Sequence, residues 1–157
     1  MQELNMGLVE EILGLWAGNV IETDSVVRIE HQNGDYSHLY RRRDAPYATD
    51  VPAQIRYIYD EFDGVDILSS AFKISPIANP SAYGGVRLFS SADELVFQMS
   101  DIQFRERVLP FCNETGNWIY AASYDSRLIF RFDVETGVIT EHPSFREVLG
   151  FYADAIR

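Results

Sequence analysis

Three histidines are the side chains of this sequence best suited to proton transfer or metal binding. His31 and His38 belong to two alternating segments on either side of Asn33-Gly34. A two-residue turn at that pair would make the two histidines diagonal neighbours on one face of a hairpin. They could share a metal ion, but the sequence places no third ligand beside them. We therefore expect buried, hydrogen-bonded histidines beside Tyr36 and Tyr40, and neither a metal nor a cofactor.

Nucleophilic and phosphate-binding patterns are also weak. Cys112 lies in an apolar segment with no histidine close in sequence, which is typical of a small buried hydrophobic side chain. His142 precedes Pro143 at an expected helix start, where we expect it to be exposed. The sequence has no Gly-x-Ser-x-Gly pattern, and Gly84-Gly85 lacks the lysine or third glycine of a phosphate loop. We expect no enzymatic activity and no catalytic residue.

An acidic cluster follows the second predicted helix, at Asp60, Glu61, Asp63 and Asp66. It lacks the loop pattern and terminal glutamate of an EF-hand calcium site. We interpret it as the solvated end of a helix. Asp60, Glu61 and Asp63 are a second candidate for contact with a protein partner.

The main candidate site is a set of aromatic and arginine side chains on two predicted strands, 117–124 and 127–133. Alternation assigns one face to an apolar set that we expect to form the core: Ile119, Ala121, Leu128, Phe130 and Phe132. The opposite face has the residue types that dominate protein-binding hot spots: Trp118, Tyr120, Tyr124, Arg127 and Arg131. We interpret this second face as partner-binding. The alternative is a secondary core, covered by the N-terminal helix or hairpin.

The elements that position these residues follow from periodicity and turn signals. Helical spacing predicts a first helix over 3–16, ended by Gly18-Asn19. The hairpin strands are expected at 26–31 and 35–41, and a two-residue turn makes Tyr36, His38 and Tyr40 face inward together with Val27, Ile29 and His31. A second helix is predicted to be capped by Asp50, to have Pro52 in its first turn, and to end at Gly64.

Capping boxes and turns organise the remainder. Ser91 and Glu94 predict the start of a short helix, and Ser144 and Glu147 predict the start of the last one. Between them, strands at 117–124, 127–133 and 138–140 form a predicted meander. The expected fold class is α+β, with a single mainly antiparallel sheet and helices packed on it.

Composition limits the function. The chain has 157 residues, 46% of them hydrophobic, which is enough for one domain with its own core. A net charge of −11 disfavours nucleic acid and anionic membranes, and it favours a cationic partner or simple solubility. The N-terminal residues have no basic segment followed by an apolar run, so we expect no secretory signal and a cytoplasmic location. No feature of the sequence specifies an oligomeric state.

The order of short motifs resembles the SUKH superfamily, which includes fungal cell-wall assembly regulators (Smi/Knr-like) and bacterial immunity proteins. The motifs, in chain order, are Val51-Pro52, Tyr57 to Gly64, Arg87-Leu88-Phe89-Ser90, Asp93-Glu94-Leu95, Leu109-Pro110-Phe111, Gly116-Asn117-Trp118, Ile129-Phe130 and Ser144-Phe145. The resemblance implies a single SUKH-like domain over 1–157, with an N-terminal helix and hairpin at 1–49 and the family-like core at 50–157.

The resemblance also implies a class of function. Members are α+β binding modules without catalytic residues, and bacterial ones are commonly inferred to be immunity proteins that neutralise a toxin, often a nuclease or deaminase. The leading hypothesis is therefore a cytosolic immunity protein that binds a basic toxin domain. Two alternatives stay open: a regulatory scaffold for cell-wall or signalling proteins, and a small enzyme with an unrecognised pocket.

Overall fold

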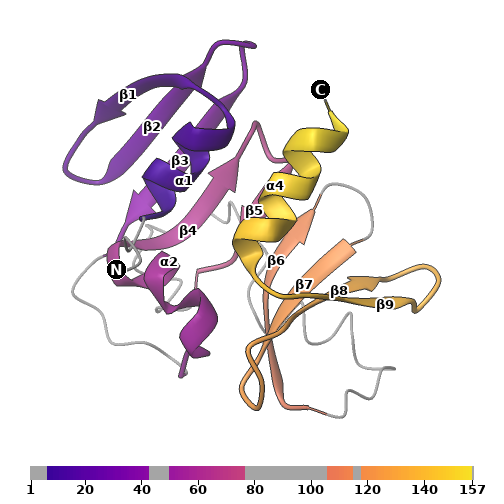
Figure 1. The fold of residues 1–157 in the computed structure, drawn as a ribbon. Helices are drawn as coiled ribbons and strands as arrows, with labels where there is room; N and C mark the ends of the chain where they lie inside the picture. Colours follow the sequence, from indigo (N-terminus) through magenta and orange to yellow (C-terminus); the bar gives the residue numbers. More distant parts are fainter. Residues whose placement is uncertain (1–6, 43–49, 77–105, 115–117, 157) are drawn as a thin grey trace, which may run out of the picture.

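The strands of the protein form one antiparallel sheet in which each strand pairs with the next in sequence (Figure 1). The computed structural model describes residues 7–42, 50–76, 106–114 and 118–156. Within these residues the sheet has nine strands: β1 Gly18–Glu22, β2 Val26–His31, β3 Tyr36–Arg41, β4 Phe62–Ile67, β5 Phe72–Ile74, β6 Val108–Glu114, β7 Trp118–Ser123, β8 Ile129–Asp133 and β9 Ile139–His142. The predicted α+β class with a single antiparallel sheet is confirmed, as is the C-terminal meander.

Helices pack against this sheet and share one hydrophobic core with it. They are α1 Leu8–Leu15, α2 Arg56–Glu61 with a preceding 3-10 turn η1 Ala53–Ile55, and α4 Phe145–Ala155. Figure 1 shows α1 and α4 beside each other in front of the sheet, and their residues are in contact. The predicted cap of the last helix is confirmed, because the Ser144 hydroxyl accepts a hydrogen bond from the Glu147 backbone N–H at 3.1 Å. Residues 91–94 lie outside the described part of the chain.

The hairpin of β2 and β3 exists, but its predicted register is wrong. Val27 pairs with Leu39 and Ile29 with Ser37, so residues 32–34 form a three-residue loop in place of the predicted two-residue turn. The last of them is Gly34, whose φ of +93° suits the left-handed position of such a loop. One extra loop residue moves every side chain of β3 to the opposite face. Tyr36, His38 and Tyr40 therefore lie on the outer face, and Leu39 and Ser37 are buried.

The predicted second helix is also too long. In the structure, helix α2 ends at Glu61. Phe62 and Gly64 belong to strand β4, which is buried along most of its length. Because both faces of β4 are covered, its residues lack the apolar and polar alternation that marks a strand at a surface. The side chain of Asp50 does not cap the helix; Pro52 precedes η1 without a side-chain cap.

Strand β1 was not predicted, since Gly18-Asn19 was interpreted as the end of the first helix. Gly18 begins β1, where it lies opposite His31 and close to the neighbouring backbone. A Cβ atom at this position would lie 2.5 Å from the carbonyl oxygen of Glu30. Glycine is therefore required for the close approach of β1 to β2.

None of the helices in the described ranges has both the length and the apolar content of a membrane span.

Candidate functional site

The predicted binding face does not lie open to solvent as one surface. Tyr120 is only 2% exposed and its ring packs 6.3 Å from that of Phe145 on α4 and 6.0 Å from that of Phe72 on β5, between ring centroids. It belongs to the main core, whereas Ile119, Ala121 and Phe132 form a small separate cluster with Val108. Tyr120 was expected on the outer face and instead lies in the core. The element that covers its side chain is the C-terminal helix, α4.

A polar network lies on this face beside the core. The Tyr120 hydroxyl donates a hydrogen bond to Oε1 of Glu114 at 2.8 Å, and the Arg131 guanidinium lies 3.4 Å from Oε2. The same guanidinium stacks over the Trp118 ring, at 4.3 Å from its centroid. Strand pairing explains the arrangement, because Glu114 is opposite Trp118 and Tyr120 is opposite Arg131 in adjacent strands. The network therefore holds four side chains in fixed positions: Glu114, Trp118, Tyr120 and Arg131.

The buried carboxylate changes the acidity of its neighbours. Burial, and next the negative charge of Glu114, raise the pKa of Tyr120 well above its usual range. Burial and the same charge raise the pKa of the Cys112 thiol, which is fully buried as predicted. Both groups are therefore protonated near neutral pH. The tyrosine acts as a hydrogen-bond donor and the cysteine as a packing residue.

A cavity of about 200 Å³ opens beside this network, between α4 and strands β6 to β9; we call it the α4 hollow. Its lining residues are Glu114, Tyr120, Arg131, His142, Val148, Phe151, Tyr152 and Ala155. Phe151 is 69% exposed, the largest exposed fraction among the large hydrophobic side chains of the described residues. An exposed aromatic ring beside a mainly buried charged floor has the composition of an interface hot spot.

The other predicted site residues lie elsewhere. The Tyr124 hydroxyl donates to the carbonyl oxygen of Asp50 at 2.6 Å, so this side chain helps to hold the chain before α2. Arg127 is exposed in the turn between β7 and β8. Of the acidic cluster, Asp60 and Glu61 are exposed, but Asp63 is only 1% exposed in β4 and cannot offer its side chain to a partner.

Sequence reasoning missed Glu114, Phe151 and Tyr152. The sequence did offer one signal for Glu114. This residue ends an apolar strand segment, where an acidic side chain is unusual. Phe151 and Tyr152 are adjacent on α4 and therefore point in different directions. The Tyr152 ring packs against the core, with its centroid 4.9 Å from that of the Phe72 ring.

A serine and histidine pair in the core has the spacing of a catalytic dyad but not its accessibility. His31 Nδ1 donates to the carbonyl oxygen of Trp16 at 2.9 Å, and Nε2 lies 2.8 Å from the Ser37 hydroxyl oxygen. Ser37 is fully buried, and its oxygen also accepts the backbone N–H of Leu68. The pair ties α1, the hairpin and β4 together, and a substrate cannot reach it.

The prediction of a buried, hydrogen-bonded His31 is confirmed. His38 instead lies between Tyr36 and Tyr40 on the outer face.

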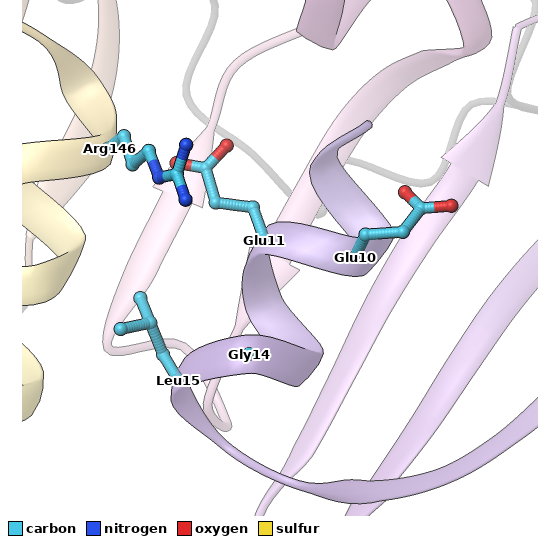
Figure 2. A pocket seen from close by; sticks show the side chains of 5 residues that line it. All are labelled: Glu10, Glu11, Gly14, Leu15 and Arg146. Carbon is cyan, nitrogen blue, oxygen red and sulfur yellow. The ribbon is translucent and has the colours of Figure 1, made fainter. Parts of the chain in front are cut away.

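A second, smaller cavity of about 130 Å³ lies between α1 and α4; we call it the α1 hollow. It is lined by Glu10, Glu11, Gly14, Leu15 and Arg146 (Figure 2). Glu11 is only 5% exposed, and its Oε1 has no hydrogen-bond partner among the described residues. Burial raises the pKa of Glu11, and a hydrogen bond with Tyr57 and the charge of Arg146 oppose this only in part.

We expect Glu11→Gln to stabilise the fold at neutral pH. The folded-state pKa of Glu11 lies above its ordinary value, so the wild type gains stability as pH falls through the folded-state pKa and loses it as pH rises. Glutamine keeps an oxygen that can accept from Tyr57 but carries no charge to desolvate. Urea unfolding should therefore give a stabilisation that is largest at about pH 8 and shrinks as the pH falls toward 4.5, the ordinary pKa of a glutamate side chain. Glu10→Gln removes a charge from an exposed position of the same helix and is the matched control, with a stability within about 0.5 kcal/mol of the wild type.

The described residues contain no group of three or more histidine, cysteine, aspartate or glutamate side chains that could hold a metal ion. No family model, no curated protein and no solved structure matches this chain.

Proposed function

We propose that this chain is a non-catalytic protein-binding module whose partner docks over the α4 hollow. The observation that carries the proposal is Phe151, which stands 69% exposed at the hollow while the adjacent Glu114, Tyr120 and Arg131 are fixed by hydrogen bonds and an ion pair. Rigid aromatic and arginine side chains lose little conformational entropy when a partner covers them. Burying one large apolar side chain contributes about 1.5–3 kcal/mol.

A basic toxin domain is the partner that we favour. The net charge of −11 attracts a cationic protein, and the resemblance to the SUKH superfamily makes a toxin of the nuclease or deaminase type the natural candidate. In this proposal the chain acts in the cytoplasm as an immunity protein: it binds the toxin before the toxin reaches its substrate. A regulatory scaffold would use the same surface, but its partner would not be toxic.

The proposal is tested by capture and by rescue of growth. Immobilised protein should retain a basic partner from a lysate of the source cells, and expression of that partner in a sensitive host should arrest growth. Co-expression of the wild-type chain should restore growth, whereas the Phe151→Ala variant should restore it poorly. A captured partner that leaves growth unaffected would exclude toxin neutralisation and favour the scaffold.

A further inference from the structure

We propose that strand β1 pairs, antiparallel, with β1 of a second copy of this chain, so that the sheets of the two copies become continuous. β1 is the first strand in the sheet order, and Figure 1 shows it at one end of the sheet, beside β2. Its residues 19–22 are all exposed. None of them lines the α4 hollow, so this pairing is separate from the proposed function and leaves that surface accessible.

The backbone of β1 has hydrogen-bonding groups on the side away from β2. Just beyond the two ends of the β1–β2 ladder, the Thr23 N–H donates to the carbonyl oxygen of Val26 at 2.9 Å, and the Gln32 N–H donates to that of Ala17 at 3.3 Å. In an antiparallel ladder, residues bonded to the neighbouring strand alternate with residues whose N–H and C=O groups point away from it. The outward-pointing residues of β1 are therefore Gly18, Val20 and Glu22.

β1 lacks the features that usually protect an edge strand. Natural edges are protected by lysine or proline, by bulges, or by a covering helix or loop. β1 contains neither lysine nor proline, and its register with β2 runs without a shift from Gly18 to Glu22. Val20 and Ile21 are 39% and 46% exposed and, as successive strand residues, point to opposite faces. The edge is therefore apolar on both faces, which favours pairing with another strand.

Symmetry identifies a second copy as the source of that strand. An antiparallel pair with Val20 opposite Val20 of the second copy overlaps the whole of β1. Gly18 of each copy then lies opposite Glu22 of the other. The outward-pointing residues of one copy meet those of the other, as the hydrogen-bonded pairs of an antiparallel ladder require, and each pair exchanges two N–H to C=O bonds. The strand is thus complementary to itself in this register, and the two-fold contact is closed.

The charges near β1 permit this contact, although the chain has a net charge of −11. Glu22 is the charged residue of β1, and its Oε2 lies 3.8 Å from the Arg41 guanidinium of the same chain. On the adjacent strand, Arg28 forms an ion pair with Glu30 at 3.7 Å. In the symmetric register the two Glu22 residues lie at opposite ends of the ladder, about 14 Å apart. This distance exceeds the Debye length of about 10 Å at 0.1 M salt, so their repulsion is screened.

The opposite edge of the sheet, β9, is less suited to pairing and provides matched controls. The Asp133 N–H donates to the carbonyl oxygen of Val138 at 3.0 Å, so Ile139 and Glu141 are the outward-pointing residues of β9. β9 is shorter than β1, and the exposed Glu141 places a charge within its edge. Ile139 is 38% exposed, close to the 39% of Val20, so each substitution at Val20 has a counterpart at Ile139.

Sedimentation equilibrium of the full chain measures the pairing. We expect the weight-average mass to rise from 18.0 kDa toward twice that value as the concentration increases from about 10 µM to about 1 mM, the range of a small, transient interface. Val20→Pro should weaken association at least about tenfold, because proline removes both hydrogen bonds at the two-fold axis. The fold should persist, since the bonds from β1 to β2 use other residues. Ile139→Pro should associate within about twofold of the wild type.

Val20→Lys is a second variant that keeps the backbone N–H. It places two ammonium groups opposite each other at the two-fold axis, and we expect association at least about tenfold weaker than in the wild type. The substitution makes the chain less acidic, so stronger repulsion between two acidic proteins cannot explain the loss. Ile139→Lys makes the same change of charge at the other edge and should not weaken association.

Cysteine cross-linking tests the register. In the proposed pairing the Cα atoms of the two Val20 residues lie about 5.5 Å apart, within the roughly 4.4–6.8 Å that a disulfide spans. With glutathione disulfide as the oxidant, Val20→Cys should therefore form a covalent dimer, and Ile139→Cys should remain mainly monomeric. Cys112 is buried, so the wild type should not cross-link.

A mass that stays at 18.0 kDa at every concentration would overturn the pairing. Equal weakening by the Val20 and Ile139 substitutions, or cross-linking of Ile139→Cys in place of Val20→Cys, would overturn β1 as the contact. None of these measurements uses Phe151 or the captured partner, so they test the pairing separately from the proposed function.

Discussion

Replacement of Phe145 by alanine is expected to lower the free energy of unfolding by about 3–5 kcal/mol, a large part of the stability of a domain of this size. Phe145 is 1% exposed at the start of α4. Its ring lies 5.2 Å from that of Phe111, 6.4 Å from that of Phe72 and 6.3 Å from that of Tyr120, between centroids. Alanine would leave a cavity where α4 meets β5, β6 and β7. Urea unfolding followed by circular dichroism measures the change.

The matched control is Phe151→Ala, which removes the same side chain from the same helix at an exposed position. We expect its stability to remain within about 0.5 kcal/mol of the wild type. Similar losses for the two variants would contradict the placement of α4 on the sheet. The same measurement is needed for the binding experiments. If Phe151→Ala folds normally, a loss of partner binding by this variant reflects the lost contact and not a loss of fold.

The second large effect is expected at Glu114. Glu114→Ala removes the acceptor of the Tyr120 hydroxyl and the ionic partner of Arg131, and it should cost about 2–3 kcal/mol. Most of this cost comes from Tyr120, whose hydroxyl would be left buried without its acceptor; Arg131 is partly exposed and can turn toward water.

A double-mutant cycle isolates this interaction. With Tyr120→Phe and the double variant, the coupling energy between the two side chains should be about 1–2 kcal/mol. Glu141→Ala, at an exposed acidic residue of β9, serves as the charge control and should stay within about 0.5 kcal/mol. A coupling energy near zero would mean that the hydrogen bond does not contribute to stability.

Local caps and turns could be predicted from the sequence, but strands β1 and β4 and the faces of the strands could not. Ser144 with Glu147 located α4, and Asn33-Gly34 located a hairpin tip, because caps and tight turns depend on a few adjacent residues. The face of β3 depends on whether its loop has two residues or three, and Asn33-Gly34 is compatible with both. A single residue therefore decided whether Tyr36 was predicted inside or outside.

The face of β7 was ambiguous for a different reason. Trp118, Ile119, Tyr120, Ala121 and Ala122 are all apolar or amphipathic, so alternation identifies two faces and does not tell which one receives a helix. That choice depends on α4, which is far along the chain and packs on Tyr120 through Phe145. Asp63 was misplaced similarly, since a strand buried on both faces carries no alternating pattern.

The candidate site was predicted only in part. Trp118 and Arg131 were correctly paired on one face, and they stack in the structure. Phe151 was not identified because it lies on the polar side of an amphipathic helix, where one exposed apolar residue is common. Its significance comes from the hollow beside it, which is formed by segments distant in sequence.

The most direct test of the proposed function is the equilibrium dissociation constant of the captured partner, measured for the wild type, Phe151→Ala and Ile156→Ala. Ile156 is an exposed apolar residue just after α4 and does not line the α4 hollow, so it controls for nonspecific loss of apolar surface. We expect Phe151→Ala to weaken binding by at least about 2 kcal/mol, roughly 30-fold, and Ile156→Ala to bind within about twofold of the wild type. Binding of Phe151→Ala at wild-type strength would contradict docking over the α4 hollow.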